Sequence, residues 1–166
     1  MNSVDIKALG NGVNEDLATS GFKRFTGDDK SLTINITHAA PGEVNRLVAA
    51  FSTTDDDLRG GNDNINMTVS FKNGRSQVFN NVNGSNRWGN NSKTSVTLNL
   101  NQAVLPENIA SITISDTFGG GMGGDNWNMG SVQIRALGSG VNKLIASHGF
   151  KRFTGSDKTL NIPTTP

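Results

Sequence analysis

The sequence predicts an all-β fold, an antiparallel β-sandwich of about nine to eleven short strands. Three observations predict it. Apolar residues alternate with polar ones along much of the chain, which is the period of a strand with one buried face. Glycine (20) and asparagine (22) are frequent, and both residue types favour turns. No segment has the apolar spacing of a helix longer than one or two turns.

The expected strands follow from this alternation in chain order. Residues 47–51 (Leu-Val-Ala-Ala-Phe) instead form a continuous apolar run, which is typical of a strand buried on both faces or at the centre of a sandwich. Pro106 interrupts the chain before another strand begins. The alternating segments are Val4–Ala8, Leu32–Ile36, Ile65–Phe71, Val96–Leu100, Ile109–Ile114 and Val132–Ala136.

One turn is predicted in detail. The dipeptide Asn73-Gly74 lies between two apolar runs, and Asn-Gly is the pair that best supplies the two positive φ angles of a type I′ turn. Residues 65–72 and 75–82 are therefore expected to pair as an antiparallel hairpin.

A repeated segment sets this chain apart. Residues 3–34 recur as residues 131–162 at a fixed offset of 128 positions, with 21 of 32 residues identical. A sandwich has one place for a given edge strand, so the two copies need different partners. Either each copy packs on an equivalent edge of its own chain, or the N-terminal copy enters the next molecule. The second arrangement is head-to-tail and would build rings or filaments.

Length and composition limit the classes of protein. A chain of 166 residues favours one domain over 1–166, and a net charge of +1 gives no reason to expect nucleic acid as a partner. There is no cysteine, so disulfides and thiolate metal sites are excluded. No apolar run is long enough for a membrane-spanning helix. The first residues lack a signal-peptide pattern, which predicts either synthesis without a leader or a start after a removed one. The sequence therefore does not assign the cellular compartment.

An acidic loop is the strongest candidate for a site. Residues 55–63 (Asp-Asp-Asp-Leu-Arg-Gly-Gly-Asn-Asp) gather carboxylates and turn-forming glycines between strands, and Ca²⁺ binds six to eight such oxygens. A second glycine-rich segment, residues 118–128, could add another aspartate. The alternative is a solvated acidic turn whose carboxylates cap backbone N–H groups. The predicted Ca²⁺ ligands are Asp55, Asp57, the Gly61 carbonyl, Asp63 and Asp125.

Two tryptophans mark a candidate ligand surface. Trp88 follows Arg87 in a loop of Asn, Gly and Ser that offers little to bury it, so an exposed ring that stacks on a sugar or dips into a membrane is expected. Packing under its own loop is the alternative. Trp127 follows Asn126 and directly precedes a strand, where it is expected to close one end of the core. The predicted ligand-binding residues are Trp88, Arg87, Trp127 and Asn126.

No catalytic motif is present in the sequence. There is no nucleophile elbow, no phosphate-binding P-loop and no HExxH motif. The protein is therefore expected not to be an enzyme.

Two segments together resemble a known family. Gly61-Asn62-Asp63 leads into one strand and Asp125-Asn126-Trp127 leads into a later one, and this arrangement over residues 44–137 resembles a PLAT/LH2-type β-sandwich. Asn62 stands where that family usually has threonine, and the repeated segment is foreign to it. The resemblance implies Ca²⁺-assisted binding of lipid, carbohydrate or protein, without catalysis.

The predicted function is therefore a non-catalytic, Ca²⁺-assisted binding module for lipid, carbohydrate or a protein partner. The repeated GFKRFTGxDK segment is similar to small modules of secreted bacterial proteins, so a secreted bacterial or toxin-associated setting is expected. The alternative is a structural protein that assembles by head-to-tail strand exchange of its repeated segment, which would make it a homo-oligomer.

Overall fold

The computed structural model describes residues 4–10, 13–20, 40–118 and 126–165. The chain divides into two compact units, Met1–His38 and Ala39–Pro166. The sandwich is formed by the second unit.

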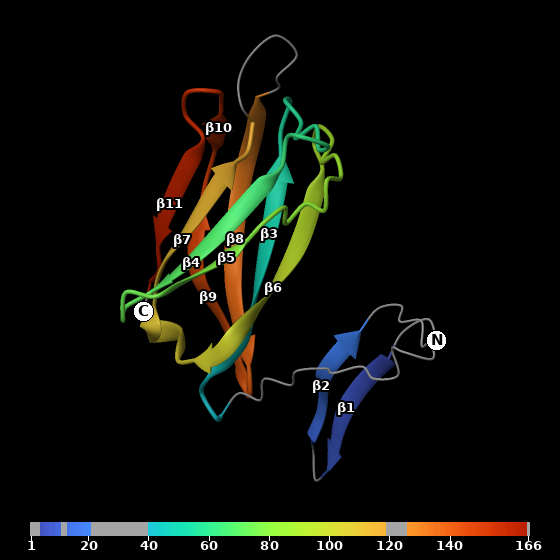
Figure 1. Cartoon of the computed structure of the whole chain (residues 1–166), viewed down its shortest axis with the longest axis vertical. Coiled ribbons are helices and arrows are strands. Elements are labelled where there is room, and N and C mark those ends of the chain that lie inside the picture. Colours follow the sequence, from blue (N-terminus) through green and yellow to red (C-terminus); the bar gives the residue numbers. More distant parts are fainter. Residues whose placement is uncertain (1–3, 11–12, 21–39, 119–125, 166) are drawn as a thin grey trace, which may run out of the picture. The chain divides into compact units, whose positions relative to one another are not determined.

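The second unit is an all-β sandwich of two antiparallel sheets, which confirms the predicted fold class (Figure 1). In the first sheet the order is β10-β8-β3-β6, and β9 also pairs with β8. In the second sheet the order is β11-β7-β4-β5. The first sheet comprises β3 (Val44–Thr53), β6 (Lys93–Val104), β8 (Trp127–Gly138), β9 (Val141–His148) and β10 (Lys151–Phe153). The second comprises β4 (Ile65–Phe71), β5 (Ser76–Phe79), β7 (Ile109–Asp116) and β11 (Thr159–Pro163).

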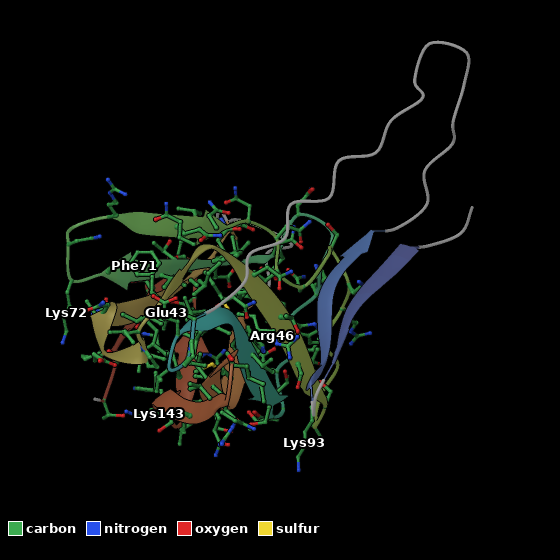
Figure 2. All side chains as sticks on the ribbon, turned by 90° about the horizontal axis from the view of Figure 1, so that it is seen from below. Glu43, Arg46, Phe71, Lys72, Lys93 and Lys143 are labelled. Carbon is green, nitrogen blue, oxygen red and sulfur yellow. The ribbon has the colours of Figure 1, made fainter. Side chains whose placement is uncertain are left out.

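Alternate residues of both sheets fill the core between them. Along β3, for example, Leu47, Ala49 and Phe51 are buried while Ala50 is exposed. The central position predicted for β3 is confirmed, since it pairs with β6 on one side and β8 on the other, but only one of its faces is buried. Viewed from one end, side chains occupy the space between the layers, while Lys72 and Lys93 extend outward (Figure 2).

The predicted hairpin forms, with a different turn. β4 pairs with β5 as expected. Gly74 has a φ of +81°, whereas Asn73 is not among the residues with positive φ, so the turn is not type I′. Instead the Gly74 N–H donates to the Phe71 carbonyl at 3.0 Å and the Phe71 N–H donates to the Arg75 carbonyl at 2.9 Å. This pattern is that of a type I turn closed by a glycine bulge.

The first unit contains one hairpin in its described residues. β1 (Val4–Gly10) pairs antiparallel with β2 (Val13–Ser20). The strand expected at Leu32–Ile36 lies outside the described residues. In the described part of the chain the only helical segment is a 3₁₀ turn at Pro106–Asn108, and no helix is long and apolar enough to cross a membrane.

Candidate metal and ligand site

Three connecting segments meet at one end of the sandwich, which we call the aspartate end. They are residues 54–64 after β3, residues 80–92 before β6, and the connection from β7 to β8, described at residues 117–118 and 126. Backbone hydrogen bonds join them. The Leu58 N–H donates to the Trp88 carbonyl at 3.1 Å, and the Asn128 N–H donates to the Asp56 carbonyl at 3.0 Å. The Thr117 N–H donates to the Asn64 carbonyl at 2.8 Å.

Gly60 shows why this end needs glycine. Its φ is +78°, and a β-carbon at this position would lie 2.6 Å from the carbonyl oxygen of Ser85. Only glycine allows the acidic segment and residues 80–92 to approach so closely.

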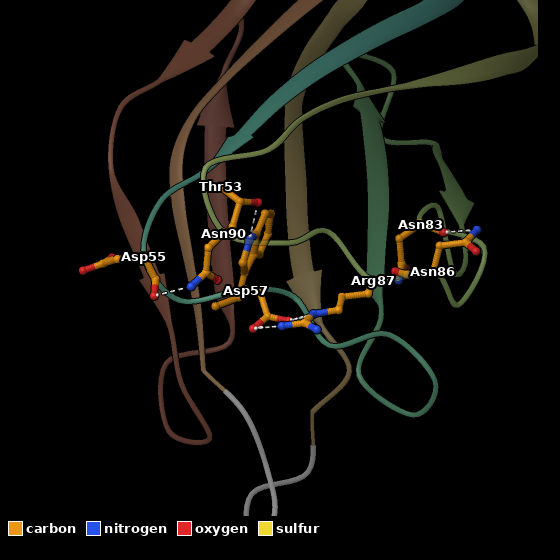
Figure 3. A network of polar contacts seen from close by, with 8 residues as sticks. Thr53, Asp55, Asp57, Asn83, Asn86, Arg87 and Asn90 are labelled. Carbon is orange, nitrogen blue, oxygen red and sulfur yellow. Dashed lines mark hydrogen bonds and ion pairs between the residues drawn. The ribbon is translucent and has the colours of Figure 1, made fainter.

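Asp55 and Asp57 each have a separate partner. The Asn128 amide donates to Asp55 Oδ1 at 2.9 Å, and this hydrogen bond is the main cause that lowers the pKa of Asp55. Figure 3 shows Asp55 with the amide of Asn90, which donates to its backbone carbonyl, and Asp57 with Arg87. The Arg87 guanidinium donates to both oxygens of Asp57 at 2.5 and 3.1 Å, and its hydrogen bond lowers the pKa of Asp57. Between them, Asp56 forms an ion pair with Arg152 at 3.3 Å. A ligand role for Asp55 or Asp57 would therefore require these contacts to open.

Asp63 and Asp116 lie inside the aspartate end, each only 5 % exposed. Asp116 pairs with Ile65 across β4 and β7, and Asp63 precedes Ile65 by two residues, just outside β4. Asp116 Oδ1 accepts the Phe118 N–H at 2.9 Å. Asp116 Oδ2 is buried and has no hydrogen-bond partner among the described residues.

The described members of the predicted Ca²⁺ ligand set are not gathered in one group. In the described ranges there is no group of three or more His, Cys, Asp or Glu side chains that could hold a metal ion. Asp125 lies outside the described residues. The Gly61 carbonyl accepts the Asn64 side-chain amide at 2.6 Å. Asp63 and Asp116, both buried, are carboxylates that lie inside the aspartate end.

The expected exposure of Trp88 is wrong. Its side chain is 4 % exposed and packs on Phe51 and Trp127, with ring centroids 5.0 and 5.6 Å away. The polar loop around it folds back so that the ring enters the core. Trp127 is fully buried, as expected, and its indole N–H donates to Thr53 at 3.1 Å. A stacking or membrane-dipping role for either ring is thus not compatible with its position.

The two polar members of the predicted ligand-binding set remain accessible. The Arg87 side chain is 66 % exposed even though it pairs with Asp57. Asn126 is half-buried beside the start of β8.

The sequence reasoning missed Asp116, Asn128 and Asn83. The alternation along β7 could have indicated that Asp116 faces inward, because Ile112, Ile114 and Asp116 lie on one face of the strand and the two isoleucines are apolar. Asn83 is 4 % exposed, and its side-chain oxygen accepts the Ile65 N–H at 3.0 Å. Nothing in the sequence distinguishes Asn83 from the rest of the 22 asparagines.

Comparison with known proteins shows the fold. No model of a known protein family matches the chain, and no curated protein matches it. Among solved structures it is similar to the alpha-toxin of Clostridium perfringens from an avian strain, with 21 % identity, 72 % of this chain covered and a TM-score of 0.59. It is also similar to the alpha toxin of Clostridium absonum, with 19 % identity, 74 % of this chain covered and a TM-score of 0.53.

The match spans 31 % and 32 % of the length of these two toxins. At this level of identity the likeness establishes the architecture alone. That architecture is the antiparallel β-sandwich expected from the sequence.

Proposed function

We propose that the protein is a non-catalytic binding module that holds Ca²⁺ at its aspartate end and uses it to bind a lipid surface. The observation that carries the proposal is Asp116 Oδ2, a buried carboxylate oxygen without a hydrogen-bond partner among the described residues. Burying such an oxygen costs free energy unless a cation or donor meets it. The resemblance to the PLAT/LH2 family supports the same reading.

The proposed ligands are Asp63, Asp116 and Asp125. Asp63 and Asp116 are both buried at this end, and Asp125 belongs to the connection that begins directly after Asp116. All three offer hard oxygen donors, which Ca²⁺ prefers. Asp55 and Asp57 are secondary candidates, because each would first have to release its present partner.

Two arginines expose cationic groups at the aspartate end, where they can meet an anionic headgroup. Arg87 and Arg152 expose 66 % and 49 % of their side chains there. A divalent cation held by the aspartates would offset their negative charge and attract a phosphate headgroup. The buried Trp88 removes the main argument for stacking on a sugar. A phospholipid surface is therefore the ligand class that we propose, and carbohydrate and protein partners are the alternatives.

Thermal unfolding with millimolar Ca²⁺ and with EDTA tests the cation. Ca²⁺ should raise the melting temperature, because a ligand that binds only the folded state stabilises it by about 2.7 kcal/mol at 100 times its Kd. Asp116→Asn should abolish the shift. Glu107→Gln, which changes an exposed carboxylate before β7, should retain it. Superimposed wild-type curves would contradict the proposal.

Vesicle flotation tests the ligand. Vesicles of phosphatidylserine and phosphatidylcholine should carry the wild-type protein upward with Ca²⁺ and release it with EDTA. Asp116→Asn should not float. Binding to a glycan array, competed by free sugar and without flotation, would replace the lipid with a carbohydrate. Silence in both assays would favour a protein partner.

A second candidate function is assembly by strand exchange. The observation that favours it is the β1–β2 hairpin, which the first unit forms from the repeated segment. If the hairpin enters a neighbouring molecule, the full chain should form oligomers and a chain lacking residues 1–40 should be monomeric by light scattering. A full-length chain that stays monomeric at high concentration would rule this out.

A further inference from the structure

The two copies of the repeated segment form the same hairpin. Ile6 pairs with Ala18 and Lys7 with Asp16, so one residue of β2 is skipped at a bulge. At the offset of 128 positions, Ile134 pairs with Ala146 and Arg135 with Leu144, and the bulge recurs at the equivalent place. The first copy thus repeats the pairing of β8 and β9 residue for residue.

The positions at which the two copies differ lie mainly outside the buried core of the second copy. The buried residues of the second copy are Val132, Ile134, Ala136, Ile145, Ala146, Phe153 and Ile162. Six of these seven are identical in the first copy, and the seventh changes Ile145 to Leu17. Of the 11 differing positions, nine are exposed in the second copy. The first copy has therefore kept an apolar residue at every position that is buried in the second copy, and its changes lie mainly at solvent-exposed positions.

A hairpin with this apolar pattern needs another element to bury its apolar face. An isolated two-stranded hairpin is marginally stable at best in water. In the second unit β8 pairs with β3, and its buried residues join the same core as those of β4 and β7. The surface that fits residues 3–34 is thus defined by their own duplicate. It is the surface that β3, β4 and β7 present to residues 131–162.

The connection to that surface is long enough. In the second unit the Thr165 N–H donates to the Ile145 carbonyl at 2.8 Å, and the Gly42 N–H donates to the Ser139 carbonyl at 3.5 Å. Thr165 thus lies beside residue 145 of β9, and Gly42 lies beside the turn that precedes residue 141. At the rise of a strand these two residues of β9 are about 13 Å apart, and this is the gap that a connection must span. Nine residues, 35–43, would join the end of the first copy to β3, and they span up to about 30 Å.

We propose that residues 3–34 are an alternative closing segment of their own chain's sandwich. They can replace residues 131–162 against β3, β4 and β7, which produces a circularly permuted sandwich. Residues 35–130 together with 3–34 supply each position of the 128-residue unit once. Residues 131–162 would then be the copy that leaves the sandwich. This inference does not depend on the cation site.

Matched substitutions in the full chain test the proposal. Ile134 is fully buried, and aspartate there should disable the second copy. Ile134→Asp should still unfold cooperatively, with both tryptophans emitting as buried residues, because the first copy closes the sandwich. Ile6→Asp alone should melt like the wild type. The double variant Ile6→Asp/Ile134→Asp should lose the transition.

The control is Ile112→Asp, at a fully buried position of β7 that has no duplicate, and it should abolish the transition by itself. If Ile134→Asp unfolds as completely as the double variant, the first copy is not a closing segment. If Ile134→Asp folds only as a dimer or larger species by light scattering, the first copy closes a second molecule, which overturns the intramolecular proposal.

A disulfide reports the docked position directly, because the chain has no native cysteine. Ala49 pairs with Ile134, and the equivalent of Ile134 is Ile6. In the Ile134→Asp background, Ala49→Cys with Ile6→Cys should form an intramolecular disulfide, since antiparallel partners lie within the required Cα distance. The mismatched pair Ala49→Cys with Lys7→Cys should not. Equal cross-linking of both pairs would contradict docking in register.

Discussion

Trp88 packs on Phe51 with ring centroids 5.0 Å apart and a tilt of 38° between the ring planes. The contact ties the loop before β6 to the central strand β3. Paired backbone hydrogen bonds between Leu58 and Trp88, at 2.9 and 3.1 Å, hold the loop in place. A tryptophan that the surrounding Asn, Gly and Ser made look like a surface residue is therefore part of the core.

Trp88→Ala is expected to cost about 3–5 kcal/mol of unfolding free energy, because it leaves a large cavity beside Phe51. Trp88→Phe should cost much less, since an aromatic ring still fills part of the space. Denaturant unfolding measures both. A variant Trp88→Ala that keeps wild-type stability and loses only lipid binding would restore the surface interpretation.

The ion pair of Asp57 and Arg87 is expected to make a small, pH-dependent contribution to stability. Because Arg87 is 66 % exposed, solvent screening limits the pair to about 0.5–1 kcal/mol. The pKa of Asp57 is lowered in the folded state, chiefly by the hydrogen bond from Arg87. Its contribution is thus present above the unfolded pKa of about 3.9 and is lost as the pH falls through the folded value.

Thermal melts of the wild type and Asp57→Asn from pH 7 to pH 3 measure this dependence. The difference in melting temperature should be constant above about pH 5 and shrink below about pH 4. Arg87→Gln should produce the same difference, and the double variant should add little. A difference that grows as the pH falls would show that another group is responsible.

Alternation in the sequence was enough to predict β4, β7 and the sandwich, because each of these strands has one regular buried face. It failed for β9. There Ile145 is the extra residue of a bulge opposite Ile134 and Arg135 of β8, so Ile145 and Ala146 are both buried and the period of two is broken. β10 has only three residues, too few to show any period.

The candidate site was predictable in composition and not in contacts. The sequence indicates an acidic loop, but which carboxylate points inward depends on pairing partners far along the chain. Asp57 meets Arg87, 30 positions away, and Asp55 meets Asn128, 73 positions away. Asp116 is turned inward by its register with Ile65. None of these contacts follows from local spacing.

Asn83 is expected to be the most sensitive asparagine of the loop before β6. Its oxygen accepts the Ile65 N–H, and its amide donates to Asn64 Oδ1 and the Asn86 carbonyl, both at 3.0 Å. Asn83→Ala would leave these groups unpaired at about 1–3 kcal/mol. Asn83→Asp keeps the size but places a carboxylate oxygen against two acceptors. It should destabilise more at pH 7 than at pH 3, where protonation restores a donor.

Asn90→Ala is the matched control for Asn83, because Asn90 is exposed and its amide makes one hydrogen bond in the structure, to the Asp55 carbonyl at 3.0 Å. It should change the unfolding free energy by less than about 0.5 kcal/mol. Equal losses at both positions would contradict the structural role assigned to Asn83.

Gly60 and Gly61 separate the cost of backbone strain from the cost of a steric clash. Both have positive φ, +78° and +69°, so alanine at either position should cost about 1–2 kcal/mol from the left-handed conformation. Only at Gly60 would the new β-carbon meet backbone, at 2.6 Å from Ser85, whereas nothing lies within 4 Å at Gly61. Gly60→Ala must therefore also push apart the acidic segment and the loop before β6. We expect it to lose clearly more unfolding free energy than Gly61→Ala, and to lose the Ca²⁺-dependent shift in melting temperature if Asp63 is a ligand. Denaturant titrations of the two variants, with and without Ca²⁺, measure both effects, and equal destabilisation would show that the two loops do not touch at Gly60.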